Sequence, residues 1–313
     1  MADRFDPAAI RRPTESNAMK PPPFSYRDPG TVEEVLQLLA EYGDDAQLLA
    51  GGQSLLPMLN FRLLQPAVII DLNGVDGLDY IQDSDDGLGI GSMARQAAVE
   101  AHPDVAQSWP LLVDALRHVA HPQIRNRGTI GGSIAHNDPA AELPAIMIAL
   151  GARMIVQSAR EQRLVPAEAF FVGHLETVMT PDELLTGIEV PAVSAAGAAA
   201  GWGFRELSRR HGDFSLAAVA VQVTPGVDGG APDARVVVTG VADKPLRVTG
   251  AEELLREGGW SDARATAIRD ATEEAVEAAE PFEDHHAPGW YRRQVAGVMA
   301  ARACQDAVAR DEI

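Results

Sequence analysis

The sequence predicts an α+β protein built from two domains, and three observations lead to this prediction. The chain has 313 residues, of which 46% are hydrophobic, so it is long enough to bury more than one core. Short apolar runs typical of strands alternate with helical patterns up to residue 190. A stretch of small residues at 191–201 then separates this part from one in which strands come first and helices follow.

The first part of the chain begins with a clear helix signal. Thr31 followed by Glu34 is a capping-box pattern, and the apolar face that follows it predicts a helix. Short apolar runs bounded by Gly, Pro and Asn predict strands at 46–50, 67–72, 87–91, 151–157 and 184–190. Longer apolar patterns predict helices at 109–119 and 139–150, and Pro139 suits the first helical position of the second.

The second part of the chain predicts strands at 202–208, 215–224 and 234–241, followed by helices at 249–257, 262–280 and 289–309. The first residues show no apolar periodicity and lead into Pro21, Pro22 and Pro23, which indicates a mobile tail. We therefore expect a tail at 1–22, a first domain at 23–195, and a second domain at 196–313 with a three-stranded sheet plus helices.

Composition and charge exclude several classes of function. The 26 basic and 45 acidic residues give a net charge of −19, which argues against binding nucleic acid or an anionic membrane surface. The single cysteine, Cys304, excludes internal disulfides and an iron–sulfur cluster held by this chain alone. No apolar run approaches the ~20 residues that span a bilayer, and the N-terminus lacks a signal-peptide pattern. We expect a soluble cytoplasmic protein without a membrane span or a metal site.

Two pairs of glycines follow apolar stretches and are the first candidates for a binding site. Gly51 and Gly52 follow Leu48, Leu49 and Ala50, and Gly131 and Gly132 follow Arg127-Gly128-Thr129-Ile130. Glycine lets the backbone approach a ligand closely, so consecutive N–H groups can converge on an anion. Each pair alone is also ordinary turn chemistry, and neither matches the Walker A or G-x-G-x-x-G patterns. Together, two such loops predict a grip on the two phosphates of a dinucleotide.

The residues around both glycine pairs resemble a known family. AGGQSLLPMLNFRL at 50–63 and RNRGTIGGSIAHNDPAAELP at 125–144 resemble the FAD-binding medium subunit of the molybdenum hydroxylases. The resemblance is to the carbon monoxide dehydrogenase medium-subunit type, with the xanthine dehydrogenase FAD domain as a more distant version. It continues through 184–191, 204–219 and 284–303, and so covers 24–303. It implies a vanillyl-alcohol-oxidase-type (PCMH-type) FAD-binding domain followed by a smaller α+β C-terminal domain.

The resemblance also implies a noncovalent FAD site. The first cofactor loop, with backbone donors to the pyrophosphate from Ala50 to Ser54, comprises Leu48, Leu49, Ala50, Gly51, Gly52, Gln53, Ser54 and Leu55. The second comprises Thr129, Ile130, Gly131, Gly132 and Ser133. In this interpretation His136 orders its loop through a hydrogen bond and is not a covalent anchor, and Asp138 caps the helix that follows.

Four further positions match cofactor contacts of the family. Glu142 matches an acidic position that accepts a hydrogen bond from ribityl or ribose hydroxyls, and Leu185 matches a backbone and apolar contact beside the flavin ring. Arg205 stands where xanthine dehydrogenase has Lys. Phe214 stands where some relatives place Tyr over the isoalloxazine face, and it can stack but cannot donate a hydroxyl hydrogen bond.

The function implied is that of an electron-transfer flavoprotein subunit. In this hypothesis an iron–sulfur small subunit passes electrons from its [2Fe-2S] clusters to FAD on this chain, and an external acceptor receives them. A large subunit holds molybdopterin and oxidises the substrate, in a dimer of heterotrimers. No catalytic acid–base residue is expected in this chain. Two alternatives remain: a stand-alone FAD-dependent oxidoreductase acting on a small molecule, and a binding or assembly protein that has lost the cofactor.

Overall fold

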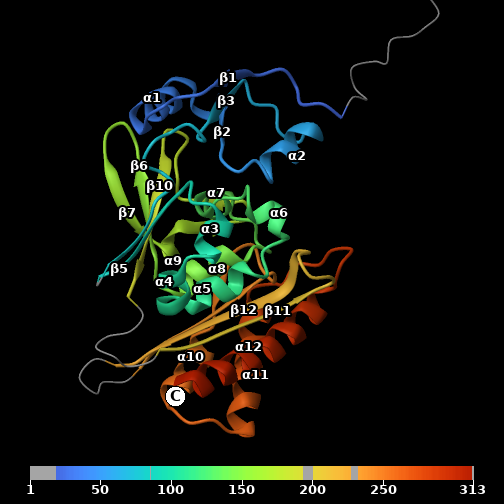
Figure 1. Cartoon of the computed structure of the whole chain (residues 1–313). Helices are drawn as coiled ribbons and strands as arrows, with labels where there is room; N and C mark the ends of the chain where they lie inside the picture. The colour runs from blue at the N-terminus through green and yellow to red at the C-terminus, as the bar shows by residue number, and fades with distance from the viewer. Residues whose placement is uncertain (1–18, 85, 193–199, 227–231, 312–313) are drawn as a thin grey trace, which may run out of the picture.

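The computed structural model of the chain describes residues 19–84, 86–192, 200–226 and 232–311. Most of the predicted tail at 1–22, and the predicted domain boundary after residue 195, lie outside these residues. Figure 1 shows a mixed α and β architecture in which the C-terminal sheet lies between two groups of helices. The predicted α+β class is confirmed.

The N-terminal region is a small parallel sheet with a helix packed on it. Its strands lie in the order β1-β3-β2, with β1 at Ser25–Arg27, β3 at Val68–Asp71 and β2 at Ala46–Leu49. Helix α1 (Val32–Tyr42) has the predicted capping box at Thr31 and Glu34. Its buried face packs on β3, and one turn of 3-10 helix (Gly43–Asp45) then leads into β2. Helix α2 (Leu55–Asn60) follows the first glycine loop.

An antiparallel five-stranded sheet forms the middle of the molecule, in the order β4-β5-β10-β6-β7. The strands are β4 (Ile81–Ser84), β5 (Gly87–Gly91), β10 (Leu184–Pro191), β6 (Arg153–Gln157) and β7 (Gln162–Pro166). Helices packed beside it are α3 (Gln96–Glu100), α4 (Pro103–Ser108), α5 (Pro110–Leu116), α6 (Pro122–Arg125), α7 (Ile130–His136), α8 (Glu142–Ala149) and α9 (Ala167–Phe170). A two-stranded hairpin, β8 (Phe171–Gly173) and β9 (Glu176–Thr177), completes this region.

The C-terminal sheet is antiparallel, in the order β11-β12-β13-β14. Its strands are β11 (Gly201–Ser208), β12 (Ser215–Thr224), β13 (Asp233–Thr239) and β14 (Leu246–Arg247). Helices α10 (Thr249–Arg256), α11 (Asp262–Ala278) and α12 (Gly289–Asp311) follow. The prediction of three strands was wrong by one, because β14 has only two residues and carries no periodic pattern of its own.

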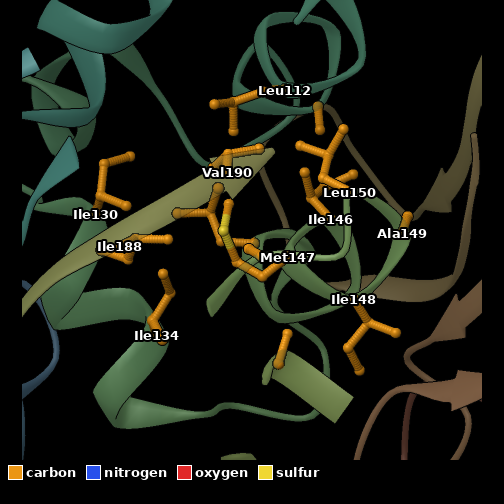
Figure 2. Packing of buried hydrophobic residues seen from close by; sticks show 14 of the residues in the cluster. Leu112, Ile130, Ile134, Ile146, Met147, Ile148, Ala149, Leu150, Ile188 and Val190 are labelled. Carbon is orange, nitrogen blue, oxygen red and sulfur yellow. The ribbon is translucent and has the colours of Figure 1, made fainter. Parts of the chain in front are cut away.

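Both faces of the C-terminal sheet are buried, and this ties the two parts of the chain together. On one face, Phe204, Ala218, Ala220 and Val237 join the core cluster that contains α5 and α8. On the other face, the alternate residues pack under α11 and α12. Figure 2 shows the centre of the first cluster, where Ile146 and Met147 of α8 lie beside Ile188 and Val190 of β10. Strand β12 is therefore apolar along most of its length, as expected for a strand covered on both sides.

Helix α8 is buried on every side but shorter than predicted. It begins at Glu142, and Pro139 lies in the preceding turn. The Pro139 carbonyl accepts from the Thr239 hydroxyl and the Gly240 N–H, so it is not used by a helical hydrogen bond. Cys304 is fully buried in α12, as expected for a packed thiol. Within the described residues, no helix combines the length and the apolar composition needed to cross a membrane.

The fold predicts a large cost for a cavity beside α8. Ile146→Ala removes a side chain with no exposed surface, and should lower the free energy of unfolding by about 2–5 kcal/mol. Leu164→Ala removes a side chain that is 46% exposed, and should cost less than about 1 kcal/mol. Urea unfolding followed by circular dichroism measures both. Equal small losses would contradict the placement of α8 in the core.

Candidate functional site

The two glycine loops, distant in sequence, lie against each other. Gly51 follows β2, and a Cβ atom built on it would lie 2.8 Å from the Cα of Gly128 and even closer to the Arg127 carbonyl. A Cβ on Gly131 would lie 2.7 Å from the carbonyl oxygen of Ser92. Side chains at these positions would push backbone away from backbone, which explains why glycine is required there. The two loops therefore form one continuous surface.

The first loop carries backbone donors that the protein does not use. Within the described residues, the N–H groups of Gly51, Gly52, Gln53 and Ser54 donate no hydrogen bond. Gly52 has φ +72°, a conformation that glycine adopts without strain, and the Gln53 side chain donates to the Gly51 carbonyl at 2.8 Å. Successive unpaired N–H groups around a positive-φ residue suit an anion. This loop fits the pyrophosphate of a dinucleotide.

The second loop differs from the expectation. Residues 130–133 form the first turn of α7, with Thr129 as its N-cap. The amide of Ile130 donates to Ala94, that of Gly131 to Ser92, and those of Gly132 and Ser133 to Thr129. Because these amides are hydrogen-bonded within the chain, the expected convergence of backbone donors on an anion fits only the first loop. The second loop instead provides small residues that leave room for a ligand to approach the backbone. Its polar side-chain groups are the hydroxyls of Thr129 and Ser133.

A hydrogen-bonded relay of two side chains joins the loops. Asn73 donates from Nδ2 to the Ala50 carbonyl at 3.0 Å, and its Oδ1 accepts from Nη2 of Arg95 at 2.6 Å. Nη1 of Arg95 donates to the Arg127 carbonyl, so one guanidinium holds both loops. Asp71 anchors the relay by accepting from the Asn73 backbone N–H at 2.9 Å and from the Tyr26 hydroxyl at 2.5 Å.

Sequence reasoning missed Asn73 and Arg95. A signal for Asn73 was present, because polar residues at the carboxyl ends of neighbouring parallel strands meet at one edge of the sheet, and Asn73 follows β3. Arg95 has no comparable local signal. An isolated β-bridge pairs its backbone with Thr129, and this places Arg95 next to the second loop.

Glu142 lies where α8 meets the C-terminal sheet. Its entry turn is fastened to that sheet: the Ser215 hydroxyl donates to the Ala140 carbonyl at 2.9 Å, and the Thr239 hydroxyl donates to the Pro139 carbonyl at 2.8 Å. The prediction that Asp138 caps this helix was wrong, because the N-cap is Ala141; Asp138 instead accepts from the Ala140 backbone N–H at 2.9 Å and closes the turn before the helix. Burial raises the pKa of Glu142 to about 7, and the charge of Asp138 adds to the rise. A buried carboxyl at this point can accept hydrogen bonds from ligand hydroxyls.

The other expected cofactor residues are arranged less tightly. Leu185 is buried on β10, whose strand packs beside α7, so it belongs to the same side of the core as the second loop. The Arg205 side chain pairs with Asp306 of α12 at 2.7 Å, on the face of β11 opposite Phe204. Phe214 is 68% exposed in the loop after β11. Cofactor contacts by these three residues stay predictions.

His136 does not make the hydrogen bond expected of it. The end of α7 is instead closed by Asn137 in the left-handed conformation, whose side chain donates to the Gly173 and Glu176 carbonyls. The His136 side chain makes no hydrogen bond to any other described residue, and burial lowers its pKa. The described part of the chain contains no group of His, Cys, Asp and Glu arranged to hold a metal ion.

Comparison with known proteins covers both parts of the chain. Residues 22–193 match the family described as the FAD binding domain in molybdopterin dehydrogenase, and residues 202–307 match the CO dehydrogenase flavoprotein C-terminal domain. Subunit alpha of the 6-hydroxypseudooxynicotine dehydrogenase complex from Paenarthrobacter nicotinovorans is 40% identical over 93% of this chain and 97% of its own length.

Two solved structures share the fold over nearly the full length of both chains. Carbon monoxide dehydrogenase from Hydrogenophaga pseudoflava matches with a TM-score of 0.86 and 38% identity, covering 93% of this chain and 99% of that chain. Quinoline 2-oxidoreductase from Pseudomonas putida 86 matches with a TM-score of 0.84 and 36% identity, covering 94% of this chain and 100% of that chain.

Separating the two loops should weaken FAD binding. Gly51→Ala forces Gly128 and the Arg127 carbonyl away, and an overpacking cost of about 1–3 kcal/mol corresponds to FAD affinity about 5- to 150-fold lower. Gly74→Ala is the matched control, because its Cβ would meet nothing closer than 3.7 Å. Quenching of flavin fluorescence on titration with the purified chain measures both. Unchanged affinity in Gly51→Ala would contradict the loop assignment.

The relay makes a second prediction. Arg95→Ala frees the Arg127 carbonyl and the Asn73 side chain, and should weaken FAD binding about tenfold through loss of loop positioning. Arg117→Ala, which removes an exposed guanidinium, serves as the control for the loss of one positive charge. Calorimetric titration with FAD distinguishes the two. Equal effects would indicate that only net charge matters.

Proposed function

The chain belongs to the FAD-binding medium-subunit family of the molybdenum hydroxylases, a family of oxidoreductase subunits, and from this premise we propose how it works. It holds FAD noncovalently in the surface made by the two glycine loops. It receives electrons from a [2Fe-2S] subunit and delivers them to an external acceptor. The observation that carries this proposal is the run of unused N–H groups from Gly51 to Ser54, packed against the second loop.

The residues fit the cofactor in two respects. The first loop offers backbone donors to the pyrophosphate, because its N–H groups donate to no other described residue. Glu142 offers a buried acceptor to hydroxyl groups, one short turn beyond α7. FAD, when bound, accepts electrons one at a time and releases them singly or in pairs. The chain itself supplies binding, orientation and exclusion of water, because none of the cofactor contacts requires a catalytic acid or base.

Partner subunits are part of the proposal. The chain has a single cysteine, which is buried in α12, so the clusters must be bound by another chain. The names of related proteins support this, since they are subunits of dehydrogenase complexes. We place molybdopterin on a large subunit and [2Fe-2S] clusters on a small one, in a dimer of heterotrimers.

Related chains of similar sequence are named for very different substrates, including nicotine, caffeine and carbon monoxide. This supports placing substrate choice on the large subunit, away from this chain. We also propose a domain division at 195/196, which the two family matches at 22–193 and 202–307 support.

A tagged full-length chain, purified from its native host, tests the proposed function. A flavin absorbance spectrum with a ferredoxin-like chain and a large molybdopterin chain is the expected result. The tagged Gly51→Ala chain should retain its partners with less flavin, because its change is confined to the loop contact. Flavin on a solitary chain would favour a stand-alone oxidoreductase, and a colourless chain that binds no added FAD would contradict the proposal.

A further inference from the structure

A second buried carboxyl, that of Glu206, lies on the face of the C-terminal sheet that packs against α8. Glu206 of β11 pairs with Ala218 of β12, which pairs with Thr239 of β13. The Thr239 hydroxyl donates to the Ala141 carbonyl at 3.2 Å, next to Glu142 in the chain.

Side chains alternate along β11, so Phe204 and Glu206 point toward α5 and α8 while Arg205 points toward α12. The Glu206 side chain is 2% exposed, and its Oε2 atom has no hydrogen-bond partner among the described residues. Burying a carboxylate without a partner costs much more free energy than burying the protonated carboxyl in the same place.

Few groups near Glu206 can compensate a negative charge. The only cationic candidate in ion-pair range within the described residues is His118, whose Nδ1 lies 3.9 Å from Oε2. Burial lowers the pKa of His118, and the positive charges of His211 and Arg205 add to this against the opposing charge of Asp114. His118 is therefore neutral at pH 7 and does not neutralise Glu206.

The acidic neighbours act in the opposite sense. Burial raises the pKa of Glu206 to about 8, the carboxylate of Glu142 adds to the rise, and the Ser208 hydroxyl acts against it. Glu142 has Asp138 beside it and no ion-pair partner within the described residues. Two buried carboxyls that repel each other titrate as a pair and do not both ionise at neutral pH.

We propose that Glu142 and Glu206 form a proton-binding pair at the cofactor site, in which Glu206 keeps a proton at neutral pH and so favours the ionised form of Glu142. This rests on the proposed function, because it assigns Glu142 to the hydroxyl groups of FAD. A neutral Glu206 removes the repulsion that would otherwise oppose an ionised Glu142. Glu206 is therefore a positioning residue that acts through Glu142. When the proton leaves, it passes to solvent and leaves a second carboxylate behind.

The proton itself can be counted without the cofactor. Potentiometric titration of the full chain free of flavin should release about one proton fewer between pH 6 and 10 in Glu206→Gln than in the wild type. Glu183→Gln is the matched control: Glu183 is also buried, but its hydrogen bond with Arg163 lowers the pKa, so its proton is already lost below pH 6. Circular dichroism at pH 6 establishes that each chain is folded.

A second measurement uses only the wild-type chain, so its result does not depend on whether the Glu206→Gln variant folds. Infrared spectroscopy of the wild-type chain with isotope-labelled glutamate should show a protonated carboxyl band at pH 7 that disappears by pH 10. Absence of this band, or equal proton release in wild type and Glu206→Gln, would overturn the proposal.

The link to FAD is read from the pH profile of binding. FAD covers the pair further from water, so a doubly ionised pair should disfavour it, and wild-type affinity should fall by up to about tenfold per pH unit above pH 8. Glu206→Gln should show a flat profile in that range, while Glu183→Gln should follow the wild type. Identical profiles in wild type and Glu206→Gln would overturn the link to the cofactor. If the wild type binds no FAD at any pH, the proposed function fails, and the proton count still decides whether the pair exists.

Discussion

The contact of backbone with backbone at Gly51 organises the candidate site. Gly51 lies so close to Arg127 and Gly128 that any side chain would separate the segments. The Arg127 carbonyl that limits the space is also the group that Arg95 holds, and the same guanidinium reaches the first loop through Asn73. Steric fit and hydrogen bonding therefore favour the same arrangement. Within it, the amides of Gly51–Ser54 are left without partners in the described chain, whereas those of the second loop are used by α7.

The C-terminal sheet adds a second part to the candidate site, at the buried place where the turn before α8 meets β12 and β13. Its hydroxyls at Ser215 and Thr239 hold the turn before α8, and this fixes where Glu142 lies. The same sheet brings Glu206 of β11 to that junction, because β11 pairs with β12 and β12 pairs with β13, the strand that ends at Thr239. A sheet buried on both faces can place a polar group in this way because the surrounding apolar residues prevent it from moving to solvent.

Sequence reasoning succeeded where the determining interactions are local. The capping box at Thr31 and Glu34 was predictable because its partners are three residues apart, and the apolar run 215–224 coincides with β12. Helix α7 was missed because the two glycines in its first turn are typical of a loop, although Thr129 was a usable cap signal. Arg95 and Glu206 acquire their roles only through contacts across the fold, so no spacing in the sequence reveals them, whereas the position of Asn73 after a strand was a usable signal. The family resemblance identified the two loops as candidate cofactor contacts. Only the structure shows which of their backbone amides are already hydrogen-bonded within the chain.

We propose that the first loop, and not the second, offers its backbone N–H groups to the cofactor. Amide hydrogen exchange of the full chain, with and without FAD, tests this residue by residue. We expect the amides of Gly52–Ser54 to exchange rapidly in the free chain and to become protected when FAD is added. Those of Gly131–Ser133 should be protected in both states. Unchanged exchange at Gly52–Ser54 in a chain saturated with FAD would contradict it.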